Sequence, residues 1–424
     1  MSERQAVFAA FADSRTGNRG AVSMLESAID HLTSPPRKGV MHVFTVYPRD
    51  DRRLPASPGV SIYNGSPCSL VFKLIPLAIL YRLCQALRLP LPRRVWGRDF
   101  GGLLDADVCL MIGGTTFTDA QLVKVIFNVA CLLPAILLGK QSMMVSQTLG
   151  PFRKWPNRLC ARWCLSRMDL VAPRGRASLE HVRQLNLPCQ VEYLPDAAFS
   201  LVVGPEVDRR IRGIYADLPR GKGIVGLCIN SIVEKKCRSL GIDHHGAWVK
   251  LIAYLRDRGY TVLLIPHSMR PKSLLRHNND LLSLREIVRM LPTMERTYLI
   301  EQPYDCKELR VVVGLADYCV VSRFHAMISA LCNGVPTLVY GWGFQKYREV
   351  MAEFRLEEYC HDAADLSGGN LIEGFEQIVQ DAGLIRQRIV ENLPRMKRWS
   401  CMNHDRAWEL YTQRNSDRLA DVAH

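Results

Sequence analysis

The chain has 424 residues, of which 48% are hydrophobic and 23% charged, and its mean hydropathy is −0.02. This length and composition fit two or three globular domains with sizeable cores, and they exclude a collagen-like chain, a disordered chain and a small disulfide scaffold. Lys and Arg (55) outnumber Asp and Glu (41), and the resulting net charge of +14 favours anionic partners such as phosphates, acidic sugars, nucleic acid or an anionic membrane surface.

The fourteen cysteines are scattered, without any C-x-x-C pair, and several lie in apolar runs. We therefore expect small buried hydrophobes rather than disulfides. The N-terminal residues Met1-Ser-Glu-Arg-Gln precede the run VFAAFA without the pattern of a signal peptide, which predicts a reducing, cytoplasmic compartment. The pair His244-His245 has no Cys or carboxylate at ligand spacing, so no metal site is expected.

Short apolar runs alternate with helical patterns through the first half of the chain. A helical spacing of apolar residues covers 21–32, after a first strand and a loop. This βαβα order predicts a parallel sheet with helices on its faces. The expected strands are 7–13, 39–48, 106–115, 141–152, 169–178 and 189–199.

Two longer apolar stretches, 68–91 and 121–139, need to be considered as membrane spans. Each is interrupted by basic or polar residues and by proline, so neither is a clean run of about 18 uncharged residues. We expect buried or interfacial helices. The segment 68–98 also combines basic residues with Trp96, which favours a peripheral contact with an anionic membrane, at its inner face.

A charged stretch at 203–223 separates this half from a second series of strands and helices. We place the boundary there and predict an N-terminal α/β domain over 1–205. A C-terminal α/β domain follows over 206–424, with its last helices packing back. Its expected strands are 223–230, 260–267, 297–302, 317–324 and 335–341, and its expected helices are 245–259, 279–291, 305–316 and 325–334.

Ligands of open parallel sheets bind beyond the carboxyl ends of the strands. This rule selects six polar or glycine-rich loops, and two Rossmann-like domains that face each other would gather them around one central cleft. In the last loop Ser322, Arg323 and His325 lie where a strand passes into a helix, an arrangement typical of an anion site. The six loops are 16–21, 113–119, 147–152, 173–178, 265–270 and 322–325.

The ordered set of motifs resembles the polysaccharide pyruvyl transferase family. Ser322-Arg323-Phe324-His325-Ala326, followed by Asn333-Gly334 and by Tyr340 to Lys346, is similar to the family's C-terminal signature. Three positions depart from the family pattern: Ala21 replaces an acidic residue, Thr115 replaces a third Gly, and no residue separates Ser322 from Arg323. Other similar motifs, in order within residues 8–351, are TGNRGA (16–21), GGTTFTD (113–119), QTLGP (147–151), Arg174 with Ser178, PDAAF (195–199), Pro266-His267 and Asn279-Asp280.

The resemblance implies a GT-B-like fold and transfer of a pyruvyl group from phosphoenolpyruvate to sugar hydroxyls of a polysaccharide or its lipid-linked precursor, forming a pyruvate ketal. Guanidinium groups suit the phosphate and carboxylate of this donor, and Arg323 and Arg174 are the candidates. His325 is the first candidate for proton transfer, and His267 and Asp119 are the further candidates. The resemblance also implies that the domain 1–205 is the acceptor side and that the domain 206–424 binds the donor. No cofactor or metal is expected. The remaining candidate substrate-binding residues are Ser322, Asn18, Gly113, Gly114, Thr115 and Lys346.

Two other classes of function stay open. A GT-B glycosyltransferase that uses a nucleotide sugar would share the fold and the anion-binding loops, and Glu349 or Glu353 would then hold the ribose. A non-enzymatic protein that binds nucleic acid or anionic lipid ranks last. Its basic residues would be expected in one stripe, whereas here they are spread along the chain without a nucleic-acid motif, so no nucleic-acid partner is expected.

Overall fold

The computed structural model describes residues 5–12, 14–55, 57–89, 92–119, 122–269, 279–343 and 345–423. Residues 13, 90–91, 120–121 and 270 lie outside the described residues, so the predicted strands, helices and loops that include them are compared with the structure only over their other residues. The contacts divide the chain into two compact units, whereas our prediction placed one boundary between 205 and 206. The first unit comprises Met1–Thr16, Met24–Ser200 and Arg398–His424, and the second comprises Gly17–Ser23 and Leu201–Lys397.

The first unit is built on a parallel sheet of eight strands with the order β3-β2-β1-β4-β6-β7-β8, and β5 pairs with β6. The strands β1, β2, β4 and β7 are near-continuous apolar runs because both faces of the sheet are covered there, as is typical of parallel sheets. The strands are β1 (Val7–Ala12), β2 (Val40–Thr45), β3 (Val60–Asn64), β4 (Val108–Ile112), β5 (Thr115–Thr116), β6 (Gln141–Leu149), β7 (Leu170–Pro173) and β8 (Gln190–Val191).

Alternate residues of β1 show how the two faces are covered. Ala9 and Phe11 belong to a core that the segment from α3 to α8 builds, whereas Phe8 packs on Trp408 of α17, with ring centroids 5.7 Å apart. The helices are α1 (Arg19–Thr33), α2 (Pro48–Asp51), α3 (Pro67–Ser69), the π-helical turn η1 (Leu70–Leu74), α4 (Ile75–Ala86), the 3₁₀ turn η2 (Arg93–Trp96), α5 (Gly97–Asp105), α6 (Leu122–Leu137), α7 (Trp155–Leu165), α8 (Arg176–Arg183), the 3₁₀ turn η3 (Ala197–Ser200) and the end of α17 (Ala382–Ala423).

The second unit is built on a parallel sheet of six strands with the order β11-β10-β9-β12-β13-β14. The strands are β9 (Ile224–Cys228), β10 (Thr261–Leu264), β11 (Thr297–Leu299), β12 (Tyr318–Val321), β13 (Thr337–Gly341) and β14 (Cys360–Asp362). The helices are α9 (Pro205–Ile214), α10 (Ser231–Ser239), α11 (His244–Asp257), α12 (Asp280–Met290), α13 (Cys306–Val313), α14 (Phe324–Cys332), α15 (Gln345–Glu353), α16 (Gly368–Gln380) and the first part of α17, with the 3₁₀ turns η5 (Glu357–Tyr359) and η6 (Ala363–Asp365).

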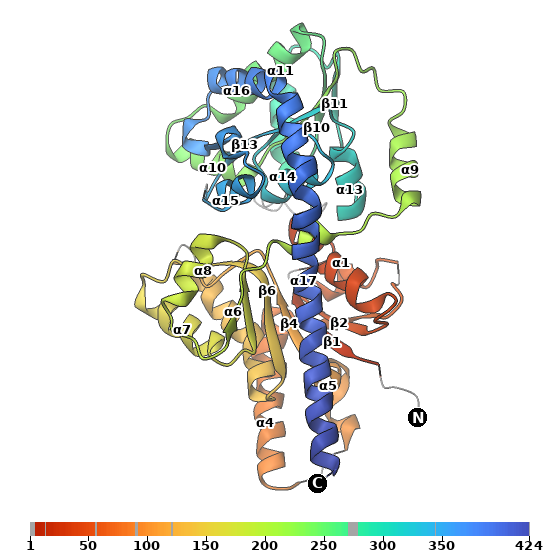
Figure 1. Ribbon diagram of the computed structural model, residues 1–424, viewed down its shortest axis with the longest axis vertical. Helices are drawn as coiled ribbons and strands as arrows, with labels where there is room; N and C mark the ends of the chain where they lie inside the picture. The colour runs from red at the N-terminus through yellow and green to blue at the C-terminus, as the bar shows by residue number, and fades with distance from the viewer. Residues whose placement is uncertain are drawn as a thin grey trace. The chain divides into compact units, whose positions relative to one another are not determined.

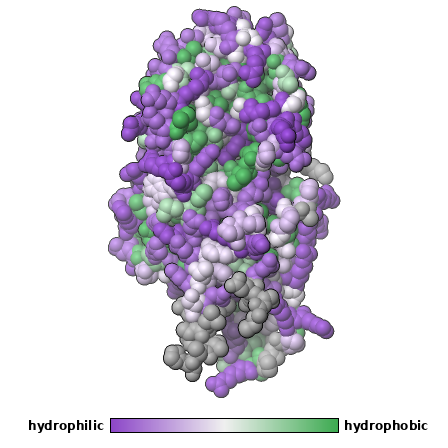
Figure 2. Space-filling view, turned by 45° about the vertical axis from the view of Figure 1, so that its right-hand side comes forward, coloured by the Kyte–Doolittle hydropathy of each residue, from purple (hydrophilic) through white to green (hydrophobic). Residues whose placement is uncertain are grey.

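The prediction of an α/β fold with two Rossmann-like parallel sheets is confirmed (Figure 1). In each sheet the strand order reverses once, between β1 and β4 in the first unit and between β9 and β12 in the second. Such a reversal leaves a crevice at the carboxyl ends of the two strands, which is where sheets of this kind bind ligands. Hydrophilic residues predominate on the face presented in Figure 2, with hydrophobic ones among them.

Candidate active site

Arg323 lies at the reversal point of the second sheet, where β12 ends and α14 begins. It is the N-cap residue of α14, and its side chain extends to Asp280 rather than capping the helix. Its Nε lies 2.9 and 3.2 Å from the two carboxylate oxygens of Asp280, and its Nη2 also donates to this carboxylate. Arg323 is 7% exposed and Asp280 is fully buried, so the two form a buried ion pair.

Asp280 is held by more than this arginine. It is the first residue of α12, and its carboxylate accepts hydrogen bonds from the backbone N–H of Ser268 at 2.8 Å and from the Ser231 hydroxyl at 3.2 Å. A buried carboxylate is tolerated when its lone pairs are satisfied in this way. The network fixes the guanidinium of Arg323 in one orientation at the end of the sheet.

Ser322 joins the two loops on either side of the reversal point. Its hydroxyl accepts from the backbone N–H of Asn230 at 2.7 Å, and its carbonyl accepts from the Asn230 side-chain amide and from the Tyr347 hydroxyl, each at 3.1 Å. These bonds tie Asn230, the N-cap residue of α10 in the loop after β9, to the start of α14. The positive end of the α14 dipole is thereby held at the crevice beside Arg323.

His267 follows β10 and is 3% exposed. Burial lowers the pKa of its imidazole well below the usual value, and electrostatic interactions with His325, Arg323 and Arg310 lower the pKa further. His267 is therefore a neutral imidazole at neutral pH. The neighbouring Ser268 donates its backbone N–H to Asp280, the carboxylate that pairs with Arg323, and His325 follows Arg323 by two residues at the start of α14. His267, His325 and Arg323 therefore lie in the same part of the second unit.

The first turn of α1 belongs to the second unit and contacts His325. Asn18 forms a bridge with Ser268, and its side-chain oxygen accepts from the backbone N–H of Gly20 at 3.0 Å. A Cβ on Gly20 would lie 2.1 Å from Nδ1 of His325 and 2.9 Å from its Cβ. Only glycine leaves room for this imidazole, so Gly20 is a positioning residue that the sequence motif contained but that we did not single out.

Lys346, on α15, lies near the start of α14. Its ammonium is 5.5 Å from the ring centroid of Phe324 and 5.2 Å from that of Tyr347, within the range of cation–π attraction. Of the predicted residues, Ser322, Arg323, His325, His267, Asn18 and Lys346 therefore lie in the second unit.

The other predicted residues lie in the first unit, where Arg174 follows β7. Its Nε donates to the Thr148 hydroxyl at 2.9 Å, and its Nη1 pairs with Asp196. A Cβ on Gly114 would lie 3.9 Å from Nη2 of Arg174, which places the predicted glycine turn beside the predicted guanidinium. Arg174 is 5% exposed and Asp196 is 1% exposed, so this pair is also buried.

Asp119 orders the chain that enters α7. Its carboxylate accepts from the backbone N–H groups of Arg153 and Lys154 at 2.7 and 3.2 Å and from the Asn157 side chain at 2.9 Å. These bonds give Asp119 a local structural role. In the neighbouring turn Thr115 is exposed in β5, and a Cβ on Gly113 would lie 3.7 Å from the Gln147 amide nitrogen.

Tertiary structure also gives His245 carboxylate neighbours that sequence spacing did not indicate. Its Nε2 lies 3.7 Å from Glu234 and 4.0 Å from Glu286, a set that could hold a cation. Glu234 is already engaged, since it accepts from Arg238 at 2.7 Å and from Ser283 at 2.6 Å.

Other features of the second unit lie apart from these residues. Glu353, a candidate ribose ligand, pairs with Arg395 at 3.0 Å, and Glu349 accepts from Gln345 at 3.4 Å.

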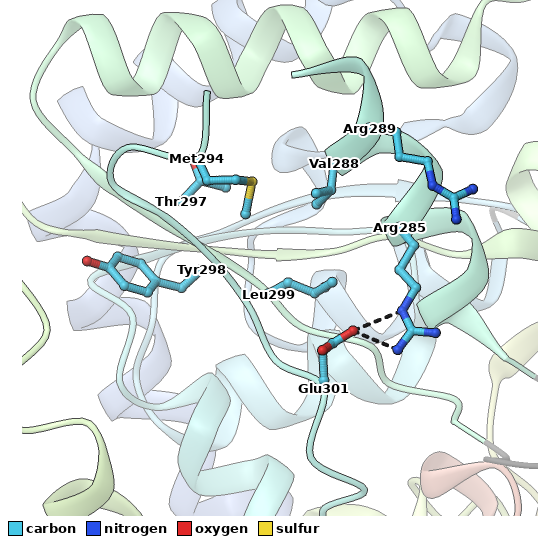
Figure 3. Close-up of a pocket in the computed structure, with 8 residues that line it drawn as sticks. All are labelled: Arg285, Val288, Arg289, Met294, Thr297, Tyr298, Leu299 and Glu301. Carbon is cyan, nitrogen blue, oxygen red and sulfur yellow. Dashed lines mark hydrogen bonds and ion pairs between the residues drawn. The ribbon is translucent and has the colours of Figure 1, made fainter. Parts of the chain in front are cut away.

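An open cavity of about 500 Å³ lies along α12 and β11, and the Arg285–Glu301 pair borders it (Figure 3). Its lining contains none of the predicted site residues.

The two parallel sheets and the loops at their carboxyl ends define a GT-B-like enzyme. Residues 18–343 match the family model described as polysaccharide pyruvyl transferase. The chain belongs to the polysaccharide pyruvyl transferase family and is a transferase. It is also 20% identical to the amylovoran biosynthesis protein AmsJ of Erwinia amylovora over 289 residues. This alignment covers 67% of this chain and 68% of that protein.

Solved structures share the fold at low sequence identity. The UDP-GlcNAc 2-epimerase of Neisseria meningitidis matches with a TM-score of 0.59 and 11% identity, over 96% of this chain and 100% of the other. The α,α-trehalose 6-phosphate synthase of Burkholderia multivorans matches with a TM-score of 0.54 and 12% identity, over 99% and 100%. Anabaena HepE, solved with UDP-glucose, matches with a TM-score of 0.53 and 11% identity, over 98% and 99%. These likenesses confirm the GT-B-like architecture.

Proposed function

We propose that this transferase uses phosphoenolpyruvate as donor and forms a pyruvate ketal on two hydroxyls of a sugar, in a polysaccharide or its lipid-linked precursor. Family membership supports pyruvyl transfer in exopolysaccharide synthesis. The observation that carries the finer proposal is the cluster of Arg323, His267 and His325 at the start of α14. It combines a fixed cation with two imidazoles, as an anionic donor and a proton transfer both require.

Phosphoenolpyruvate carries a phosphate and a carboxylate next to the reacting carbon. Arg323 offers a planar fork for one of these groups, and Asp280 holds that fork in place through Nε and Nη2. The dipole of α14 and the ammonium of Lys346 add positive potential in the same part of the second unit. The donor is therefore expected to bind at the reversal point between β9 and β12.

The proposed reaction adds two sugar oxygens to C2 of the donor and breaks its C2–O bond to phosphate. One hydroxyl proton is transferred, directly or through a protein group, to C3, which becomes a methyl group. The other leaves with the phosphate, so that a ketal carboxylate and hydrogen phosphate are formed. The reaction as proposed uses no cofactor or metal, and activity that survives a chelator would support this.

His325 is proposed to accept the proton of the attacking hydroxyl and to deliver it to the donor. His267 is neutral, because burial lowers its pKa, so it suits the role of a hydrogen-bond partner or base better than that of an imidazolium acid. Gly20 keeps His325 in position from the side of α1. These assignments place the chemistry in the second unit, and Arg174 with Gly114 is then a candidate for acceptor binding in the first.

The proposal is tested by measuring phosphate release from phosphoenolpyruvate with glycan acceptors, together with thermal stabilisation by phosphoenolpyruvate and by UDP-GlcNAc. We expect phosphoenolpyruvate to stabilise the protein and Arg323→Lys to weaken its binding, because lysine lacks the planar fork. Arg395→Lys, which changes a half-exposed arginine paired with the buried Glu353 in the same unit, is the matched control and should bind the donor normally. Stabilisation by UDP-GlcNAc alone, with no phosphate release, would favour the nucleotide-sugar alternative.

A further inference from the structure

The segment from α3 through α4 is apolar on two opposite faces. A buried stripe of Leu70, Leu74, Ala78 and Cys84 joins the core of the first unit. The opposite stripe is equally apolar but exposed, and Phe72 is the extreme case at 80%. A helix that is apolar all round needs an apolar partner on both sides. The exposed members of this stripe are Val71, Phe72, Ile79, Leu80, Leu83 and Leu87.

Basic residues predominate in the segment that carries this stripe. Residues 66–98 contain six Lys or Arg and no Asp or Glu. Lys73 pairs with Asp99 at 2.9 Å and Arg93 pairs with Asp105. Arg82 and Arg88 lie on or directly after the exposed helix, where their long side chains can extend beside its apolar face. This combination complements an anionic lipid surface, whose acyl chains accept the apolar residues and whose headgroups attract the basic ones.

Neighbouring helices carry the same combination. α6 contacts both α4 and α7, so the three helices form one layer of the first unit. On α7 the exposed residues Trp155, Leu159 and Trp163 follow each other at intervals of four, which places them on one face of the helix. Ile126 of α6 is 72% exposed. Between Asp119 and Asp169 the sequence has seven Lys or Arg and no acidic residue.

The segment Pro67–Ala86 is long and apolar enough to cross a membrane by length and composition. Its packing argues against a span. The strand before it, β3, and the strand after it, β4, belong to the same sheet, and its buried stripe packs on the core beneath that sheet. In Figure 1, α4 extends downward from the first unit. The geometry fits a helix that lies in the membrane–water interface, with one face packed on the protein and the other facing lipid.

We infer that the exposed faces of η1, α4, α6 and α7 form a docking surface for an anionic bilayer, here called the lipid face. Tryptophans beside basic residues are typical of the membrane–water interface. The occupant is the bilayer itself, because the surface pairs apolar with basic residues and spans several helices. This inference rests on the proposed function only where it specifies the acceptor: a membrane-docked enzyme would act on a lipid-linked glycan at that surface.

The test measures binding of the full-length protein to vesicles of phosphatidylcholine alone and of phosphatidylcholine mixed with phosphatidylglycerol, without substrates. We expect binding to the mixed vesicles that falls as salt is raised. Phe72→Ser should weaken it about tenfold, because a large apolar side chain no longer enters the lipid. Arg82→Gln should weaken it about fivefold through the loss of one basic contact.

Two controls distinguish binding through the lipid face from nonspecific adsorption to vesicles. Val390→Ser removes a residue that is 69% exposed on α17 in the second unit, and it should leave vesicle binding unchanged. Brominated lipid should quench the tryptophan fluorescence of the protein, and the quenched fraction should be smaller in Trp155→Phe, which lacks one of the seven tryptophans. All variants should keep the parent unfolding temperature.

Absence of vesicle binding, or equal loss in Val390→Ser, would overturn the inference. A concentration-dependent dimer that Phe72→Ser abolishes, without vesicle binding, would assign the surface to a second copy instead and would also overturn it. Failure of the proposed function is a separate result, because it would appear as no phosphate release with a water-soluble acceptor while vesicle binding persists.

Discussion

The first and second units each hold a buried arginine after a strand of their sheet, and in each case a buried aspartate pairs with it. In the first unit Arg174 follows β7, away from the reversal point of the sheet, and Asp196 comes from the chain after β8. In the second unit Arg323 lies at the reversal point itself, and its partner Asp280 begins α12. Both units therefore contain a buried Arg–Asp pair, but only the pair of the second unit lies at the reversal point of its sheet.

The surroundings of the two arginines explain why we assign them different roles. Arg323 has two histidines nearby, and its charge acts on His267. Arg174 is surrounded by Thr148, Gly114 and Asp196, and Asp196 is fastened in turn by Ser400 of α17, whose hydroxyl donates to the Asp196 carbonyl at 2.8 Å. Among the contacts described here, histidines that could transfer a proton lie near Arg323 and not near Arg174. The predictions below test this difference.

The largest expected effect concerns a histidine from each unit. His325→Asn should lower turnover about 10²–10⁴-fold with a much smaller loss of donor binding, if His325 transfers the proton. His404→Asn changes a buried histidine of the first unit that contacts the hydroxyls of Ser27 and Ser200, each at 3.1 Å. Its turnover should stay within about threefold of the parent. Equal turnover in the two variants would remove His325 from the mechanism.

The two arginines should behave alike in stability and differently in donor binding. Arg323→Ala and Arg174→Ala each leave a buried carboxylate without its cation, which should cost about 3–5 kcal/mol in the free energy of unfolding. Denaturant titration measures this cost. The milder changes Arg323→Lys and Arg174→Lys keep the charge, and calorimetry with phosphoenolpyruvate should show at least about a tenfold loss only for Arg323→Lys. Equal losses would make both arginines donor ligands.

Gly20→Ala tests the contact that positions His325. The added methyl group would overlap the imidazole, so His325 must turn away, and turnover should fall about 10–100-fold as expected for a misplaced catalytic group. The matched control is Gly101→Ala in α5 of the first unit, where a Cβ would meet nothing within 4 Å. That variant should keep parent activity. A fully active Gly20→Ala enzyme would contradict the assigned role of His325.

The smallest expected effect is a pH dependence of stability that both units share. Burial lowers the pKa of His404 and of His267 well below the ordinary value of 6.5, and His31 and Arg37 lower the pKa of His404 further. The unfolded chain then binds protons that the folded chain does not, so stability falls as the pH drops below about 6.5, by up to about 1.4 kcal/mol per pH unit for each histidine. His404→Gln should reduce this slope in denaturant titrations between about pH 5 and pH 7.5.

Sequence patterns were sufficient to predict the α/β class, because strands of a parallel sheet are apolar runs and the segments between them show helical spacing. They also located the loops, since ligand loops follow the carboxyl ends of such strands. The family was recognisable because its polar motifs recur in a fixed order. In the second unit Ser322, Arg323 and His325 could be predicted together, because they are adjacent in the chain at the end of one strand.

Only the tertiary structure determined which partners these residues have. Asp280 comes from 43 positions away to pair with Arg323, and Gly20 comes from another part of the chain to contact His325. Such contacts depend on which strands are neighbours in the sheet, and a spacing along the chain does not record this. For the same reason the sequence could not distinguish the buried stripe of α4 from its exposed stripe. Both stripes are apolar in composition, and only the packing of the core decides which of them remains in contact with the surroundings.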